Sequence, residues 1–220
     1  MKFTKSSYGL AIWAGALSLL LSLLSATAVA EEGLLAPQKV IQHTADQMQV
    51  TLQKPEYKND FRKATSFVDG ILESHVDFER VSIMILGKHW KQATPEQRAK
   101  FKKEFRMLLV RTYTTAFTEY ADWQIRYLPL DMKPGDKKAM VRTEILQSGA
   151  QPVGVNYRMV YTKGDWKVYD VLIEGISLLQ NYRSSFTEEV SRTGSLDHLI
   201  ARLAERNASA LKEPVSKEGS

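Results

Sequence analysis

The sequence predicts an α+β fold in which helices pack on a curved four-stranded antiparallel sheet. Three observations support this fold class. Apolar residues recur at helical spacing up to about residue 121, alternate as in strands from Trp123 to Ile173, and return to helical spacing beyond Gly175. The connections inside the strand region are short, which favours an antiparallel meander because parallel strands need long crossovers.

The N-terminal 30 residues have the features of a cleaved signal peptide. Lys2 and Lys5 are followed by an apolar stretch from Leu10 to Leu24, and Ala28-Val29-Ala30 is a small-x-small cleavage site. A retained membrane anchor is the alternative, but about 15 apolar residues are fewer than the roughly 20 that a spanning helix needs. An exported chain without cysteine has no disulfides, so its stability must come from one core built by the 190 residues that remain of 220.

Three helices are expected in the first third of the mature chain. The first runs from Ala36 to Leu52, with Pro37 at its start and Pro55 beyond its end. The second spans residues 59–75 and the third residues 78–90. Gly87 lies near the end of the third helix and predicts a bend or a close contact there.

A long fourth helix begins at Thr94-Pro95-Glu96-Gln97, which combines an N-cap, a proline at the first helical position and a capping box. It should run to about residue 121, a length of roughly 40 Å at 1.5 Å per residue. An aromatic-rich apolar stripe follows one side of it. Such stripes are usually plain core, but the length of this one also suits it to covering a long apolar ligand.

Four strands are expected at residues 123–127, 139–146, 153–161 and 166–173. In the last strand, Tyr169, Val171 and Ile173 share one face. Asp170 and Glu174 share the opposite face, which we expect to be solvated.

Two further helices complete the predicted domain, which spans residues 31–206. The first follows Gly175 and ends near Thr193-Gly194, and the second spans residues 195–206. From Asn207 to Ser220 large apolar residues are few, so this segment is expected to be a disordered tail.

Composition and motifs argue against nucleic-acid binding, metal binding and catalysis. Without Lys2 and Lys5, 28 of the 30 basic residues remain against 25 acidic ones, a formal charge of +3 that is too mild for a nucleic-acid protein. The four histidines are scattered and there is no cysteine to complete a metal site. Ser177 lacks the second glycine of a nucleophile elbow and is better explained as a helix N-cap. Asp170 and Glu174 should lie roughly 13 Å apart along the strand, too far for a glycosidase pair.

Two stretches carry a resemblance to a known family. The sequence WKVYDVLIEGISLLQNYRSSF from Trp166 to Phe186, and the run from Asp77 to Phe105, resemble the MlaC or toluene-tolerance family of periplasmic phospholipid-binding proteins. The resemblance covers nearly the whole mature chain. It implies an NTF2-like or cystatin-like fold with a lipid cavity between helices and sheet.

The resemblance also implies a function and partners. The chain would be a monomeric periplasmic carrier that shuttles glycerophospholipid between the outer and inner membranes, without cofactor, metal or catalytic step, and so maintains outer-membrane lipid asymmetry. Its partners would be an MCE-domain subunit of an inner-membrane ABC transporter and an outer-membrane lipoprotein–porin complex.

The periodicities predict which residues line the cavity and which contact partners. The cavity-lining residues are those on the inward faces: Leu86, Phe105, Leu109, Tyr113, Phe117, Val141, Val155, Tyr157, Met159, Tyr169, Val171 and Ile173. Arg98, Lys102 and Arg106 form a basic stripe on the outer side of the fourth helix, which we expect to contribute to docking. A solvated helix face is the commoner explanation of such a stripe.

Two other functions remain open from the sequence. An NTF2-like enzyme or small-ligand binder would use the same pocket, but it would need a polar dyad among inward positions that are almost all apolar. A non-binding envelope scaffold would retain no lipid on purification, whereas a carrier would.

Overall fold

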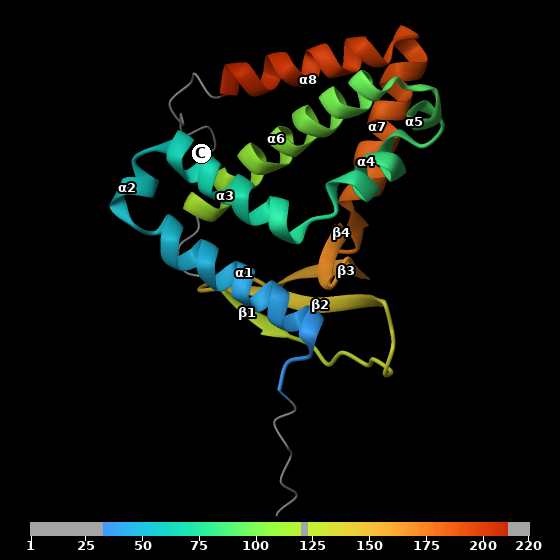
Figure 1. The fold of residues 1–220 in the computed structure, drawn as a ribbon. Helices are drawn as coiled ribbons and strands as arrows, with labels where there is room; N and C mark the ends of the chain where they lie inside the picture. Colours follow the sequence, from blue (N-terminus) through green and yellow to red (C-terminus); the bar gives the residue numbers. More distant parts are fainter. Residues whose placement is uncertain (1–32, 120–122, 211–220) are drawn as a thin grey trace, which may run out of the picture. The chain divides into compact units, whose positions relative to one another are not determined.

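The computed structural model describes residues 33–119 and 123–210. The expected signal peptide, residues 1–30, lies outside the described residues. The chain divides into Met1–Leu34 and Leu35–Ser220, and the following concerns the second unit alone. Its described part contains helices and an antiparallel sheet, as predicted (Figure 1): α1 (Ala36–Leu52), α2 (Pro55–Lys58), α3 (Phe61–His75), α4 (Phe78–Leu86), α5 (Lys88–Gln92), α6 (Pro95–Glu119), β1 (Trp123–Tyr127), β2 (Lys138–Gln147), β3 (Val153–Thr162), β4 (Asp165–Ile173), β5 (Ile176–Ser177), α7 (Leu178–Thr193) and α8 (Leu196–Ala210).

Local capping explains where several helices begin. Asp60 and Asp77 precede α3 and α4, and each carboxylate accepts a hydrogen bond from a backbone N–H in the first turn. Gly87 adopts a φ of 51° and separates α4 from α5, so the predicted helix over residues 78–90 is broken into two. Left-handed φ values favour glycine because a Cβ is strained there.

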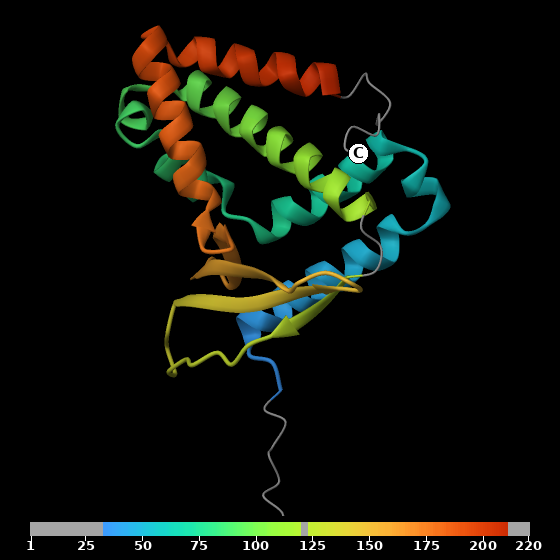
Figure 2. The ribbon, with the colours of Figure 1, turned by 180° about the vertical axis from the view of Figure 1, so that it is seen from behind.

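The capping box that opens α6 is formed as predicted. The Thr94 hydroxyl accepts a hydrogen bond from Gln97 N (3.2 Å), and the Gln97 side chain accepts one from Thr94 N (3.0 Å). The described helix has 25 residues, which corresponds to about 38 Å. Its expected last residues, 120 and 121, lie outside the described residues. Figure 1 shows α6 between α3 and α8, and Figure 2 shows the same order from behind.

The sheet has the order β1-β2-β3-β4-β5, with every neighbouring pair antiparallel. Four strands were expected, and the fifth is the two-residue strand β5. Glu174 and Gly175 both adopt positive φ, 49° and 80°, and reverse the chain so that Ile176 pairs with Ile173. The predicted start of the next helix is therefore preceded by a tight hairpin.

The register gives the sheet one apolar face. Directly paired residues of an antiparallel sheet share a face. The pairs Val141–Tyr157, Tyr157–Val171 and Val155–Ile173 therefore lie on the same side. We call this side, which also carries Met159, the apolar face. Helix α1 packs on it through Ile41, and Figure 1 shows α1 beside β1 and β2 with α3, α6 and α8 stacked beyond it.

The helices enclose two further apolar clusters. One joins α4, α6, α7 and α8 and contains Phe101, Phe105 and Phe186, whose rings meet at centroid distances of 5.8–6.0 Å. The other joins α1, α3 and α6 through residues such as Leu52 and Val110. The apolar surface is thus divided among three clusters rather than gathered in one continuous core.

Asp170 corrects one expectation. Its side chain is not solvated, since the residue is 5% exposed. Its carboxylate accepts hydrogen bonds from Arg158 (2.9 Å), from the Ser177 hydroxyl (2.8 Å) and from Leu179 N (3.1 Å). Asp170 thereby ties β4 to the first turn of α7. The Ser177 hydroxyl also accepts from Gln180 N, which confirms its predicted role as an N-cap.

The C-terminal helix is longer than expected. Helix α8 continues to Ala210, so the predicted tail does not begin at Asn207. Asn207 is buried, donates to the Glu104 backbone carbonyl and carboxylate, and accepts a hydrogen bond from Arg111. These contacts hold the last turns of α8 against α6. Residues 211–220 lie outside the described residues.

Candidate functional site

Four of the twelve predicted cavity residues are buried in apolar clusters. Leu86, Phe105, Val141 and Met159 are 2%, 1%, 0% and 0% exposed. Leu86 and Phe105 lie within the α4–α6–α7–α8 cluster, while Val141 and Met159 lie under α1. Side chains packed on all sides offer a ligand no surface, so the lining of a cavity by these four residues stays a prediction.

The other eight predicted residues keep part of their surface accessible: Leu109, Tyr113, Phe117, Val155, Tyr157, Tyr169, Val171 and Ile173. Four of these eight are contiguous on the sheet. Val155 pairs with Ile173 and Tyr157 pairs with Val171, so they form a two-by-two group on the apolar face. We call Val155, Tyr157, Val171 and Ile173 the apolar block.

The remaining four predicted residues, Leu109, Tyr113, Phe117 and Tyr169, do not belong to the apolar block. Tyr169 is the extra residue of a bulge in β4, because Val168 and Asp170 face consecutive residues of β3. Tyr169 and Leu109 both pack against the α4–α6–α7–α8 cluster. The ring centroid of Phe117, near the end of α6, lies 6.1 Å from that of Trp123, so Phe117 reaches β1.

Tyr157 lies deep in the protein although part of its side chain is accessible. Burial raises the pKa of the Tyr157 phenol from 10 to about 12. Burial likewise raises the pKa of Tyr113, Tyr127 and Tyr182. A low-dielectric environment disfavours the phenolate, and partial accessibility means that protein atoms do not cover the ring completely.

The apolar face extends further than the sequence predicted. Ile145 pairs with Ile125 of β1 and with Val153 of β3, and all three have accessible surface. Tyr127 pairs with Thr143, which in turn pairs with Val155. The alternation of apolar residues in β1 and β2 already indicated this larger apolar face. Which alternating face is left partly uncovered depends on where α1 crosses the sheet, which periodicity does not reveal.

The predicted basic stripe is engaged in contacts within the protein. The side chain of Arg106 is 21% exposed and pairs with two carboxylates of α3, so it does not project outward as expected. Lys102 pairs with Glu79 at 2.8 Å. Arg98 donates to the Trp90 carbonyl at 3.0 Å and lies over the Trp90 ring. The docking role of these residues stays a prediction; the Lys102 side chain, 43% exposed, is more accessible than that of Arg106.

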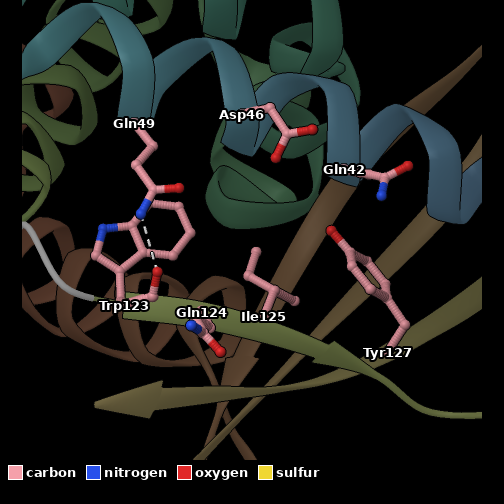
Figure 3. Close-up of a pocket in the computed structure, with 7 residues that line it drawn as sticks. All are labelled: Gln42, Asp46, Gln49, Trp123, Gln124, Ile125 and Tyr127. Carbon is pink, nitrogen blue, oxygen red and sulfur yellow. Dashed lines mark hydrogen bonds between the residues drawn. The ribbon is translucent and has the colours of Figure 1, made fainter. Parts of the chain in front are cut away.

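A separate pocket of about 350 Å³ lies between α1 and β1 (Figure 3). Gln42, Asp46 and Gln49 approach it from one side of α1, at spacings of four and three residues that place them on one helix face. Trp123 and Tyr127 approach it from β1. This pocket is polar, unlike the apolar block, and sequence reasoning missed it.

Residues 33–119 and 123–210 contain neither a metal-ion cluster nor a membrane-spanning helix. No group of three or more His, Asp or Glu side chains there is arranged to hold a metal ion. None of the helices in this part of the chain combines the length and apolar character needed to cross a membrane.

Comparison with known proteins identifies relatives along most of the chain. Residues 42–205 match the sequence profile of the MlaC protein family. The intermembrane phospholipid transport system binding protein MlaC of Haemophilus influenzae is 28% identical over 187 residues, covering 82% of this chain and 85% of the relative. Toluene tolerance protein ttg2D of Pseudomonas putida is 29% identical over 185 residues, covering 82% and 86%.

A solved structure shares the fold. It is that of a phospholipid-binding protein from Ralstonia solanacearum in complex with a phospholipid, which superposes with a TM-score of 0.74 at 30% sequence identity. The match covers 81% of this chain and all of that one. Since the family profile spans well over half of the sequence and the fold agrees, the chain belongs to the MlaC family.

Proposed function

We propose that this chain is a phospholipid carrier that holds acyl chains between its helices and the apolar face of its sheet. The apolar block carries the proposal. Val155, Tyr157, Val171 and Ile173 are directed toward the helical side, yet none is fully buried. Folding normally removes such a contiguous apolar surface from water, so its incomplete cover indicates that another apolar molecule completes it.

The relatives support the same ligand class. The Haemophilus influenzae protein is named for intermembrane phospholipid transport, and the Ralstonia solanacearum structure contains a phospholipid. The half-buried residues of α6, Leu109, Tyr113 and Phe117, would complete the lining opposite the sheet. Tyr169 would contribute from the bulge of β4.

The energetics of acyl-chain burial determine how such a carrier must work. Two C16 chains contain about 30 methylene and methyl groups, and removing these from water contributes on the order of 24 kcal/mol gross at about 0.8 kcal/mol each. Spontaneous release into water is therefore extremely slow. The carrier must unload by direct contact with a partner that accepts the chains.

The proposal includes location and partners. Cleavage after residue 30 would release the protein into the periplasm. There it would act as a monomer and exchange glycerophospholipid with an MCE-domain subunit of an inner-membrane ABC transporter and with an outer-membrane lipoprotein–porin complex. This shuttle would maintain outer-membrane lipid asymmetry. The support for these partners is the family membership.

Native mass spectrometry tests the carrier function. The full chain is exported to the periplasm of a Gram-negative host, purified without detergent, and weighed before and after solvent extraction. We expect an added mass that corresponds to glycerophospholipid and is recovered in the extract. Protein that carries no lipid, and takes up none from phospholipid vesicles, would contradict the proposal and favour a scaffold.

A further inference from the structure

The α1–β1 pocket combines one carboxylate, two aromatic rings and amide groups. In Figure 3, Asp46 lies between Gln42 and Gln49 on α1, opposite Ile125 on β1, and the Tyr127 hydroxyl is directed toward α1. The Gln49 amide donates to the Trp123 carbonyl at 2.9 Å, which fixes one end of the pocket. The pocket therefore has an anchored wall and one formal negative charge.

The negative charge of the pocket has no cation within the described part of the chain. Asp46 is exposed, and no ion pair or hydrogen bond of its side chain is found there. Asp46 is near enough to Tyr127 that its charge, after burial and Tyr157, contributes to raising the pKa of that phenol. The ring of Tyr127 thus lies in the field of an uncompensated carboxylate.

A carboxylate beside aromatic rings is the chemistry that recognises an organic cation. Ammonium groups are attracted to the faces of Trp and Tyr, and an adjacent carboxylate adds direct charge pairing. A metal ion fits poorly, because only one carboxylate is present and hard cations take six or more oxygen ligands. An anion would be repelled by Asp46.

The pocket adjoins the apolar face on which acyl chains are proposed to lie. Ile125 at its floor pairs with Ile145, and Tyr127 is connected through Thr143 to Val155 of the apolar block. Two strand spacings separate Tyr127 from Val155, a distance of about 10 Å. A group in the pocket and an acyl chain on the apolar block could therefore belong to one amphipathic molecule.

We infer that the α1–β1 pocket binds an alkylammonium group, with Asp46 as its counter-ion and Trp123 and Tyr127 as its aromatic walls. The group is carried either by the head group of the transported lipid, ethanolamine or choline, or by a free amine. The lipid source rests on the proposed carrier function, while the free-amine source does not.

A competition between head groups tests the lipid source. Lipid-free protein is incubated with vesicles that contain equal amounts of phosphatidylethanolamine and phosphatidylglycerol with identical acyl chains, and the bound lipids are extracted and weighed. We expect about fivefold enrichment of the ethanolamine lipid, which is the size of effect that one partly desolvated cation–aromatic contact provides. Asp46→Asn should abolish the enrichment at unchanged total lipid, and Asp46→Lys should invert it.

A matched control and a second arm separate the outcomes. Asp165→Asn removes one negative charge from the exposed first residue of β4 and should leave the enrichment intact. Calorimetric titration of lipid-free protein with ethanolamine or choline tests the free-amine source: binding that Asp46→Asn removes supports the inference even if the lipid competition is unbiased.

Two outcomes of these experiments would contradict the proposed alkylammonium site. No head-group bias together with no amine binding would contradict the ammonium site while leaving the carrier function intact, because total bound lipid is measured in the same experiment. An enrichment that survives Asp46→Asn would also contradict it. Absence of any bound phospholipid would contradict the carrier function, and the amine titration would then decide the pocket alone.

Discussion

Tryptophan substitutions at Val155 and Val141 should have opposite consequences. Both valines lie on the apolar face of neighbouring strands, Val155 paired with Thr143 and Val141 paired with Tyr157. Val141 is 0% exposed, whereas Val155 is only half-buried and belongs to the apolar block. The two positions therefore differ in whether space exists in front of the side chain.

The expected magnitudes follow from that difference. At Val141 a tryptophan must displace packed neighbours, which costs about 3 kcal/mol. At roughly 2–4 °C per kcal/mol for a domain of this size, the melting temperature should fall by about 6–12 °C. At Val155 the ring should enter the ligand space. If it excludes about five methylene groups of an acyl chain, roughly 4 kcal/mol of transfer energy is lost, and lipid affinity falls about a thousandfold.

The assay must compare lipid-free proteins, because bound lipid itself raises the melting temperature by mass action. Each variant is delipidated, melted by circular dichroism, and then reloaded from vesicles, with bound lipid determined by mass spectrometry. Val155→Trp should melt within about 2 °C of the parent protein and retain little lipid. If Val155→Trp is destabilised as strongly as Val141→Trp and still binds lipid, Val155 is ordinary core and does not face the ligand.

Three further predictions concern the polar contacts. Asp170→Asn should lower the free energy of unfolding, measured in urea, by about 2–3 kcal/mol, because charge-assisted hydrogen bonds to a buried carboxylate are weakened. A change below about 0.5 kcal/mol would show that the attachment of α7 does not depend on these hydrogen bonds. Arg202 holds the pKa of Glu189 below its ordinary 4.5, so ionised Glu189 stabilises the fold above that pH. The difference in unfolding free energy between the parent protein and Glu189→Gln should therefore disappear as pH falls through the lowered pKa. A difference that persists in acid would exclude this linkage. Replacing Arg98 and Lys102 by Glu should slow lipid transfer to acceptor membranes that carry the partner, and the decrease in transfer rate should be smaller at high salt. An unchanged transfer rate at low salt would show that these two charges have no role in docking.

Elements specified by local signals could be predicted closely from the sequence. The bounds of α1 and β1 agree with the prediction, and the capping box of Thr94 and Gln97 forms as expected, because proline, caps and short-range periodicity act within a few residues. The break at Gly87 was foreseen only as a bend. A backbone φ of 51° is a property of the local chain path, and glycine permits it without requiring it.

Properties that depend on distant residues could not be predicted. Asp170 was expected to be solvated, yet Arg158 of β3 and the first turn of α7 surround it. Alternation placed Val141 and Val155 on the correct face but could not distinguish packed from half-buried, because that depends on where α1 crosses the sheet. The same limit applies to the α1–β1 pocket, since its two walls are more than 70 residues apart in the sequence.

Photo-crosslinking tests most directly whether acyl chains lie against the apolar face. The protein is loaded with a phospholipid that carries a diazirine in one acyl chain, irradiated, digested, and its labelled peptides are sequenced by mass spectrometry. We expect labels on the apolar block of β3 and β4 and on the half-buried residues of α6, with none on Met140 or Arg142, which point to the opposite face of the sheet. Labels concentrated on that opposite face, or no labelling of protein that demonstrably carries the lipid, would contradict the account.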